Sequence, residues 1–318
     1  MQPERLRLTA YRPDLADRWN AFVRQSKNGT FLFDRRYMDY HADRFEDCSL
    51  VAFEGDDESN LVAILPASRS GSGITSHAGL TYGGWVTDQR MTTQAMLALF
   101  DRLRAWATPA GVSSLRYKAM PRCYHRMPAD EDLYALFTQG AVPSHLEVSS
   151  LIDLQAGLAW SKGRKHSHSK ARRAGVEVVE SHDFADFVLC LEEVLARHDA
   201  HAVHSVTELR LLSERFPDQI HLYSANLEAR ACAYVLVYDC GLTLHTQYMA
   251  ARPLGRQNGG LEAIIHSLQY DIYPERRYIS FGTSTESHGR VLNSGLIAQK
   301  EMFGARAMVC QFFDLSFS

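Results

Sequence analysis

Residues 281–306, FGTSTESHGRVLNSGLIAQKEMFGAR, place several reactive side chains between a strand-like apolar run and a helix-like run. Thr283 and Ser284 carry hydroxyl groups that can donate hydrogen bonds, and Glu286 carries a carboxylate that can accept a proton. Polar side chains at the C-terminal end of a strand lie where open α/β sheets bind ligands. These residues can instead form a capped turn before the next helix, and both interpretations stay open.

His245 and Tyr248 lie in a strand-like segment, LTLHTQYMAA at residues 242–251, and offer a second pair of reactive groups. A histidine titrates near neutral pH and can act as a base, and a tyrosine hydroxyl can protonate a leaving group. Strict alternation along a strand predicts that these two side chains lie on opposite faces. The alternative is that each is a buried residue whose polar atoms bond to the backbone.

Three histidines, His198, His201 and His204, follow one another at intervals of three residues. The segment runs off the end of a predicted helix and lacks an HExxH pattern, and a zinc site would also need an acidic residue or a cysteine in register. We therefore predict no metal site. His204 lies in a loop between two predicted helices, where it can act as a base or contact an acceptor; a surface position before the next helix is the alternative.

Composition favours a globular protein of the cytoplasm. The chain has 318 residues, of which 46% are hydrophobic, and its formal net charge is −3, so bulk charge does not call for nucleic acid or an anionic membrane as partner. Its six cysteines are scattered without a CxxC pair, as expected of reduced thiols. No segment has the roughly 18 consecutive apolar residues that would cross a bilayer, and the N-terminal residues do not resemble a signal peptide.

A local basic segment, WSKGRKHSHSKARRAG at residues 160–175, contains six lysines and arginines and no acidic residue. Such a cluster can bind phosphate groups of a cofactor, a nucleotide-linked sugar or RNA. A solvated helix face is the alternative for each of these residues taken singly.

The second half of the chain shows a regular order of elements. Alternating and amphipathic patterns predict the order strand, two helices, three strands, helix, strand, helix, strand between residues 175 and 315. A glycine-rich turn, RPLGRQNGG at residues 252–260, is predicted to precede the third helix. The first half follows the same order, so we predict an internal duplication with domains at residues 1–155 and 156–318.

This order is that of the GNAT acyltransferases, and the tandem arrangement resembles the FemABX-like branch of that superfamily. The segments that carry the resemblance are SHAGLTYGG (76–84), YKAMPRCYHRMPADEDLYALF (117–137), HTQYMA (245–250) and the FGTSTESHGR…KEMFGAR segment. The resemblance implies an α/β fold, with a mixed sheet, made of two tandem GNAT-like domains, and acyl transfer as the reaction class. In that fold the fourth and fifth strands of a domain diverge, and the acyl donor lies in the gap.

The resemblance also implies where an acyl-CoA donor would bind. Its pyrophosphate would lie on the N-terminus of the helix between the two diverging strands, where glycines admit close backbone contact. The usual Arg/Gln-x-x-Gly-x-Gly/Ala pattern is matched imperfectly, because Gln257 or Leu261 takes the last position. The residues expected to contact the donor are Arg252, Gly255, Arg256, Asn258, Gly259 and Gly260.

The remaining site residues follow from the same resemblance. Glu286 is expected as the base, directly or through a water, with Thr283 and Ser284 as hydroxyl donors to the substrate. Three residues of the first domain lie in segments that match the family and are expected to contact the substrate: Tyr82, Lys118 and Tyr124.

Three functions remain open from the sequence. We favour transfer of an acyl group from acetyl-CoA or another acyl-CoA to an amine or hydroxyl of a cell-envelope sugar or related metabolite, by direct attack in a ternary complex. The first alternative is aminoacyl transfer from aminoacyl-tRNA, which Fem-type relatives use as donor, to a cell-wall precursor or a peptide. The second is a binding or scaffold protein that keeps the fold without turnover.

Overall fold

The computed structural model describes residues 1–198 and 201–317, which divide into two compact units. Unit 1 contains residues 1–147, 287–290 and 309–318, and unit 2 contains residues 148–286 and 291–308. The sequence placed the boundary near residue 155 and assigned the whole C-terminal end to the second domain. In the structure the chain passes from unit 1 to unit 2 within strand β8 (Val142–Asp153) and returns within β16 (Arg306–Ser316).

Unit 2 is built on the run of strands β8-β13-β12-β11-β10-β9. All neighbouring pairs in this run are antiparallel except β12 and β13, which are parallel. The bounds of the strands not yet given are β9 Glu177–Ser181, β10 Ile220–Leu227, β11 Arg230–Asp239, β12 Thr243–Ala251 and β13 Tyr278–Thr283, with a short hairpin of β14 Thr285–Glu286 and β15 Val291–Leu292.

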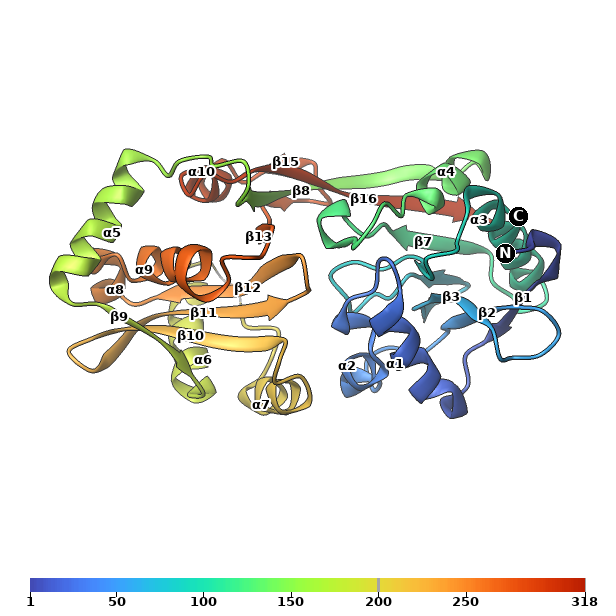
Figure 1. The fold of residues 1–318 in the computed structure, drawn as a ribbon, viewed down its shortest axis with the longest axis horizontal. Helices are drawn as coiled ribbons and strands as arrows, with labels where there is room; N and C mark the ends of the chain where they lie inside the picture. Colours follow the sequence, from blue (N-terminus) through green and yellow to red (C-terminus); the bar gives the residue numbers. More distant parts are fainter. Residues whose placement is uncertain (199–200, 318) are drawn as a thin grey trace. The chain divides into compact units, whose positions relative to one another are not determined.

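Helices cover both faces of these strands (Figure 1). Helix α9 packs on one face, where Ile264, Ile265 and Leu268 join a core with Val235 and Val237 of β11. Helix α6 packs on the other face, against β12. The helices of unit 2 are α5 Lys162–Ala174, α6 Phe184–Leu195, α7 Val206–Arg215, α8 Pro253–Asn258, α9 Gly260–Ser267 and α10 Ser294–Glu301, and Leu268–Ile272 adds a π-helical turn.

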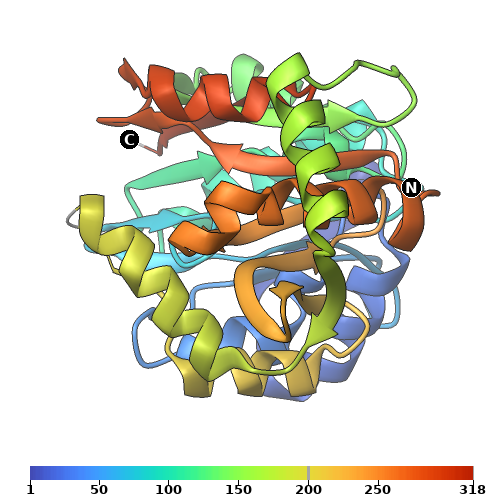
Figure 2. The same ribbon diagram turned by 90° about the vertical axis from the view of Figure 1, so that its left-hand side faces the viewer.

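Two segments of unit 2 differ from the sequence prediction. The basic segment after residue 160 is helix α5, which Ser161 caps and Gly175 ends in a left-handed conformation (φ 74°). Figure 2 shows α5 crossing in front of α9, and the two helices are in contact. The predicted glycine-rich turn is largely helical as well, because Pro253 begins α8 and only Gly259, at φ 71°, breaks it from α9. Glycine spacing alone did not distinguish a turn from two consecutive short helices.

Unit 1 repeats the predicted order of elements on two sheets. Strands β1-β2-β3-β6 form one sheet, and β4-β5-β7-β16-β8 follow one another in the other. Helix α3 buries Leu99, Phe100 and Leu103 in the core of this unit. The remaining bounds are β1 Leu6–Ala10, α1 Ala16–Gln25, α2 Arg35–Met38, β2 Leu50–Glu54, β3 Leu61–Leu65, β4 Ser68–Ser70, β5 Gly73–Thr75, β6 Val86–Thr87, α3 Thr93–Ala107, β7 Ser114–Lys118 and α4 Glu131–Thr138.

In the part of the chain that the structure describes, no helix combines the length and the apolar character that a membrane span requires.

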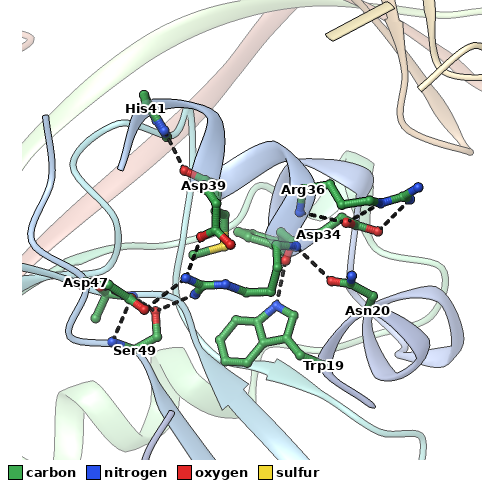
Figure 3. A network of polar contacts seen from close by, with 12 residues as sticks. Trp19, Asn20, Asp34, Arg36, Asp39, His41, Asp47 and Ser49 are labelled. Atoms are coloured by element: carbon green, nitrogen blue, oxygen red, sulfur yellow. Dashed lines mark hydrogen bonds and ion pairs between the residues drawn. The ribbon is translucent and has the colours of Figure 1, made fainter. Parts of the chain in front are cut away.

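A buried arginine organises the first helices of unit 1. The Arg35 guanidinium binds Asp39 at 2.6 Å and Asp47 at 2.9 Å, and it lies 4.1 Å from the ring centroid of Tyr11. Figure 3 shows Asp39 and Asp47 in this network, with the Trp19 ring beside it. The Trp19 indole donates to the Phe33 carbonyl at 2.7 Å. The buried Arg35 cation therefore connects α2 to Asp47, which lies just before β2.

We predict that Arg35→Met destabilises unit 1. The substitution keeps an apolar side chain over Tyr11 but removes the charged hydrogen bonds to Asp39 and Asp47, whose carboxylates stay partly solvated, so we expect a loss of about 1.5–3 kcal/mol. Urea denaturation followed by circular dichroism measures the change. Arg44→Met is the control, because the Arg44 side chain is 40% exposed and its Nε lies 3.9 Å from the Asp43 carboxylate. We expect this substitution to change the free energy of unfolding by less than about 1 kcal/mol. Equal effects of the two substitutions would contradict the role given to Arg35.

Candidate active site

Strands β12 and β13 separate after a short parallel pairing. Their pairs are Thr243 with Tyr278, Leu244 with Ile279 and His245 with Ser280. Strand β12 then continues to Ala251, whereas β13 turns toward β8, with a register shift between Ser280 and Thr283. The divergence expected between these strands is thus present and begins at His245 and Ser280.

Lys300 of α10 fixes the end of β13 at this point. Its Nζ donates to the carbonyl oxygens of Gly282 at 3.0 Å and Thr283 at 2.7 Å and to the Ser284 hydroxyl at 2.8 Å. The side chain is 5% exposed, and burial lowers the pKa of its amine to about 8. Three acceptors match the three protons of an ammonium group. The sequence suggested no role for Lys300, although this lysine lies in the KEMFGAR segment that carries the family resemblance.

His245 lies beside this lysine and is buried. Its Nδ1 is 3.4 Å from the Ser280 hydroxyl, and a Cβ atom at Gly282 would lie 3.6 Å from its Cε1. Burial, and secondly the charge of Lys300, lowers the pKa of His245 to about 4. The imidazole is therefore neutral at physiological pH, when it can both donate and accept a hydrogen bond.

A β-bulge in β12 corrects the face predicted for Tyr248. Thr246 pairs with Val237 and Tyr248 with the next residue, Leu236, so Gln247 has no partner in β11. The extra residue reverses the alternation, and Tyr248 lies on the same face as His245 rather than the opposite one. The face predicted for Tyr248 was wrong because no residue pattern in this segment indicated the bulge.

Tyr248 and His204 meet, although they are far apart in the sequence. The Tyr248 hydroxyl lies 2.8 Å from Nδ1 of His204, and the two rings are 5.8 Å apart in an edge-on arrangement. His204 is 7% exposed, and burial raises the pKa of Tyr248. His204 was predicted as a loop residue near the acceptor, and the structure places it just before the Ser205 cap of α7. The pair can pass a proton between an imidazole and a phenol.

The hydroxyl and carboxylate groups after β13 have internal partners. Ser284 is 1% exposed and accepts from Lys300, and its carbonyl accepts from the Asn293 amide at 2.9 Å. Glu286 is exposed, and its Oε1 accepts from the Asn293 side chain at 2.9 Å. Thr283 is exposed and pairs with Ser149. Glu286 thus lies in the β14–β15 hairpin, and Asn293 is the cap of α10; participation of these residues in catalysis stays a prediction.

The glycines expected to contact a donor allow close packing of chain segments. A Cβ atom at Gly255 would lie 2.1 Å from the Cys232 carbonyl oxygen, and one at Gly259 would lie 2.3 Å from the Ser167 carbonyl oxygen of α5. A Cβ atom at Gly260 would lie 2.9 Å from the Cβ of Ala233. Packing therefore accounts for these glycines, and their contact with a phosphate stays a prediction.

The polar residues of this region also bind within the unit. Arg252 makes two ion-paired hydrogen bonds to Asp186 of α6, at 2.7 and 2.8 Å. Arg256 donates to the Ala251 carbonyl at 2.6 Å, and the Asn258 amide donates to a carbonyl one turn earlier in α8. Arg252 thus ties α6 to the start of α8, which is a structural reason for its presence.

The three residues expected to contact substrate in unit 1 lie close to the loop at residues 76–84. Tyr82 and Tyr124 are each 3% exposed, with ring centroids 4.5 Å apart, and the Tyr82 hydroxyl lies 3.0 Å from that of Thr30. The Lys118 amine donates to the carbonyls of His77 and Leu80, and burial lowers its pKa to about 8. Their contact with an acceptor stays a prediction.

Residues 1–198 and 201–317 contain no cluster of three or more potential metal ligands. The side chain of His198 lies outside the described residues.

We predict that His245 titrates near pH 4 and that Lys300→Met raises its pKa, because the nearest positive charge is removed. Two-dimensional NMR of labelled imidazole groups measures both. The unfolded chain binds this proton near pH 6.5, so the contribution of His245 to stability is lost as the pH falls from about 6.5 to 4.

Lys162→Met, which removes an exposed lysine of α5, is the control and should leave the His245 pKa unchanged. Titration of His245 near pH 6.5 in the unmodified protein, or the same pKa with and without Lys300, would contradict this electrostatic coupling.

Solved structures of known proteins share the fold of this chain, whereas comparisons by sequence found no match. No protein-family profile and no curated protein sequence match the chain. The solved structure of FemX aligns with a TM-score of 0.68 at 10% identity, covering 98% of this chain and 97% of FemX. L-PGS from Bacillus licheniformis aligns with 0.59 at 13% identity, covering 96% and 92% of the two chains.

A third structure extends the likeness to proteins with two GNAT units. A tandem GNAT protein from the clavulanic acid biosynthesis pathway aligns with a TM-score of 0.50 at 12% identity, covering 98% of this chain and 99% of that one. These alignments extend over nearly the whole chain. They confirm the predicted fold class: the chain has a mixed α/β, GNAT-like fold of the FemABX type.

Proposed function

We propose that this protein is an acyltransferase whose reaction takes place where β12 and β13 diverge. The observation that carries this proposal is the arrangement of Lys300 and His245 at the divergence. A buried cation and a neutral imidazole there flank a strand end that Lys300 fixes by two hydrogen bonds to backbone carbonyls and one to the Ser284 hydroxyl. Such preorganised groups stabilise the negative charge that develops on a carbonyl oxygen during acyl transfer.

The proposed step is direct attack of an acceptor amine or hydroxyl on the acyl carbonyl carbon. The new bond joins the acceptor nitrogen or oxygen to that carbon, and the bond to the donor's sulfur or oxygen breaks. The acceptor loses a proton to a base, and the leaving group gains one. Positive charge at Lys300 favours the tetrahedral intermediate, and His245 can donate a hydrogen bond to its oxygen.

The proton is proposed to pass through Tyr248 and His204. These two side chains are already 2.8 Å apart, and Tyr248 lies on the same face of β12 as His245. Glu286 is the second candidate base, since its carboxylate is exposed and near the end of β13. We favour the tyrosine–histidine pair because Glu286 already accepts a hydrogen bond from the side chain of Asn293, the N-cap residue of α10.

Substitution of the two candidate bases distinguishes them. We predict that Tyr248→Phe lowers kcat by about 100-fold or more, as expected for loss of a proton-transfer group, whereas Glu286→Gln changes it less than about threefold. Steady-state kinetics with the donor found active measures both. Thermal unfolding of each variant serves as the control for folding. A large loss with Glu286→Gln and normal turnover with Tyr248→Phe would reverse the assignment.

The donor is proposed to be either an acyl-CoA, as the sequence favoured, or an aminoacyl-tRNA. One observation favours the tRNA ester: α5 covers the first turn of α9, with the Ser167 carbonyl against Gly259. That turn is where the GNAT resemblance places the pyrophosphate of CoA. The higher TM-score with FemX than with the tandem GNAT protein, 0.68 against 0.50, agrees with this preference. For the acceptor we propose an amine or hydroxyl of a cell-envelope sugar, precursor or related metabolite.

Two assays on the same preparation separate the donors. We predict transfer of label from a mixture of radiolabelled aminoacyl-tRNAs to amine acceptors, and little thiol release from acetyl-CoA or longer acyl-CoAs. Lys300→Met is the matched inactive control in both assays. Thiol release that depends on Lys300, without transfer from aminoacyl-tRNA, would establish the acyl-CoA donor instead. Absence of both activities would support the binding or scaffold alternative.

A further inference from the structure

Unit 2 contains a pocket of about 600 Å³ that the proposed transfer chemistry does not use. It lies between the segment at residues 152–160, helix α5 and the end of α9 with the following turn. All of its lining residues belong to unit 2. The pocket borders the basic helix whose phosphate-binding role the sequence left open.

Aromatic rings form one wall of the pocket. His168 and His266 stack with ring centroids 3.9 Å apart, and Trp160 lies edge-on to both at 6.1 Å. Tyr270 lies 4.6 Å from His266 and is 60% exposed, so its ring is available to a ligand. Burial lowers the pKa of both histidines, which keeps the stacked pair neutral. A flat heterocycle can stack on such a surface.

A buried amide provides a hydrogen-bond donor in the same wall. Gln269 is 4% exposed, and its Oε1 accepts from the Trp160 indole at 3.2 Å. This bond fixes the orientation of the amide, and its Nε2 has no partner among the described residues. An unpaired buried donor costs stability, which an acceptor atom on a ligand would recover.

The charge at the mouth of the pocket favours an anion. Lys165 and Ser169 line it from consecutive turns of α5. The Ser169 hydroxyl donates to the Lys165 carbonyl at 2.9 Å, whereas no carboxylate pairs with the Lys165 amine among the described residues. Asp153 is the acidic residue in the wall, and its carboxylate is bound to Arg277 at 3.3 Å and to the backbone amide of Gln155 at 3.0 Å. A phosphate can therefore lie at Lys165 while a ring occupies the aromatic wall.

We propose that this pocket binds a nucleotide. The base stacks on Tyr270 and the histidine pair, a ring nitrogen or carbonyl of the base accepts from Gln269 Nε2, and the phosphate contacts the Lys165 amine. The nucleotide can come from a free mononucleotide or from the 3′ end of a single-stranded RNA, since both present the same base, ribose and phosphate. Binding at this pocket does not depend on the proposed transfer reaction, and it is measured without an acyl group.

Calorimetric titration of the full chain with AMP, with ATP and with the trinucleotide CCA tests this proposal. We expect saturable binding of at least one of these probes and much weaker binding of ribose 5-phosphate, which lacks the base. Tyr270→Ala should weaken binding by about tenfold or more through loss of stacking. Lys165→Ala should weaken it by about three- to tenfold and reduce its dependence on salt.

Lys170→Ala is the matched control, because Lys170 is exposed on the same helix and does not line the pocket. Binding of CCA alone would identify RNA as the source, and binding of AMP or ATP alone would identify a free nucleotide. The proposal is overturned if none of the three probes binds at millimolar concentration. It is also overturned if ribose 5-phosphate binds as tightly as AMP, or if Tyr270→Ala and Lys165→Ala bind like the unmodified protein.

Discussion

The site in unit 2 depends on the hydrogen bonds that the Lys300 ammonium makes to the end of β13. Parallel strands normally continue side by side, and β13 would lose partners when it leaves β12 after Ser280. Lys300 supplies donors to the carbonyls of Gly282 and Thr283 at the point where the strand turns. Divergence of the strands and burial of a cation therefore occur together, and the cation that stabilises the turn adds to the effect of burial in lowering the pKa of His245.

The order of the elements could be predicted from the sequence because each depends on local pattern. Helix α7 begins at the Ser205 capping box, and the helical periodicity of residues 206–215 continues to its end. His204 and Tyr248 could each be named as candidates for the same reason, since residue type and element were both visible. The contact between His204 and Tyr248 could not be predicted, because it depends on the bulge at Gln247. The alternation of polar and apolar residues does not indicate that bulge.

Contacts between residues far apart in the sequence could not be predicted from local pattern. Lys300 looked like an ordinary helical lysine, because nothing local shows that its amine reaches carbonyl groups about 17 residues earlier. The glycines at 255 and 259 looked like a phosphate-binding turn, but each also permits close packing against another segment. A glycine required for packing and one required for ligand contact have the same sequence signal.

Helix α5 is held against α9 and α10 of unit 2 by charged and close-packed contacts. Arg164 forms an ion pair with buried Glu262 of α9 and donates to the Gln299 carbonyl of α10 at 3.3 Å, while Ser167 contacts Gly259. Movement of α5 away from the first turn of α9 would leave Glu262 buried without its cation, at a cost of several kcal/mol. A donor that approaches without displacing α5 avoids that cost.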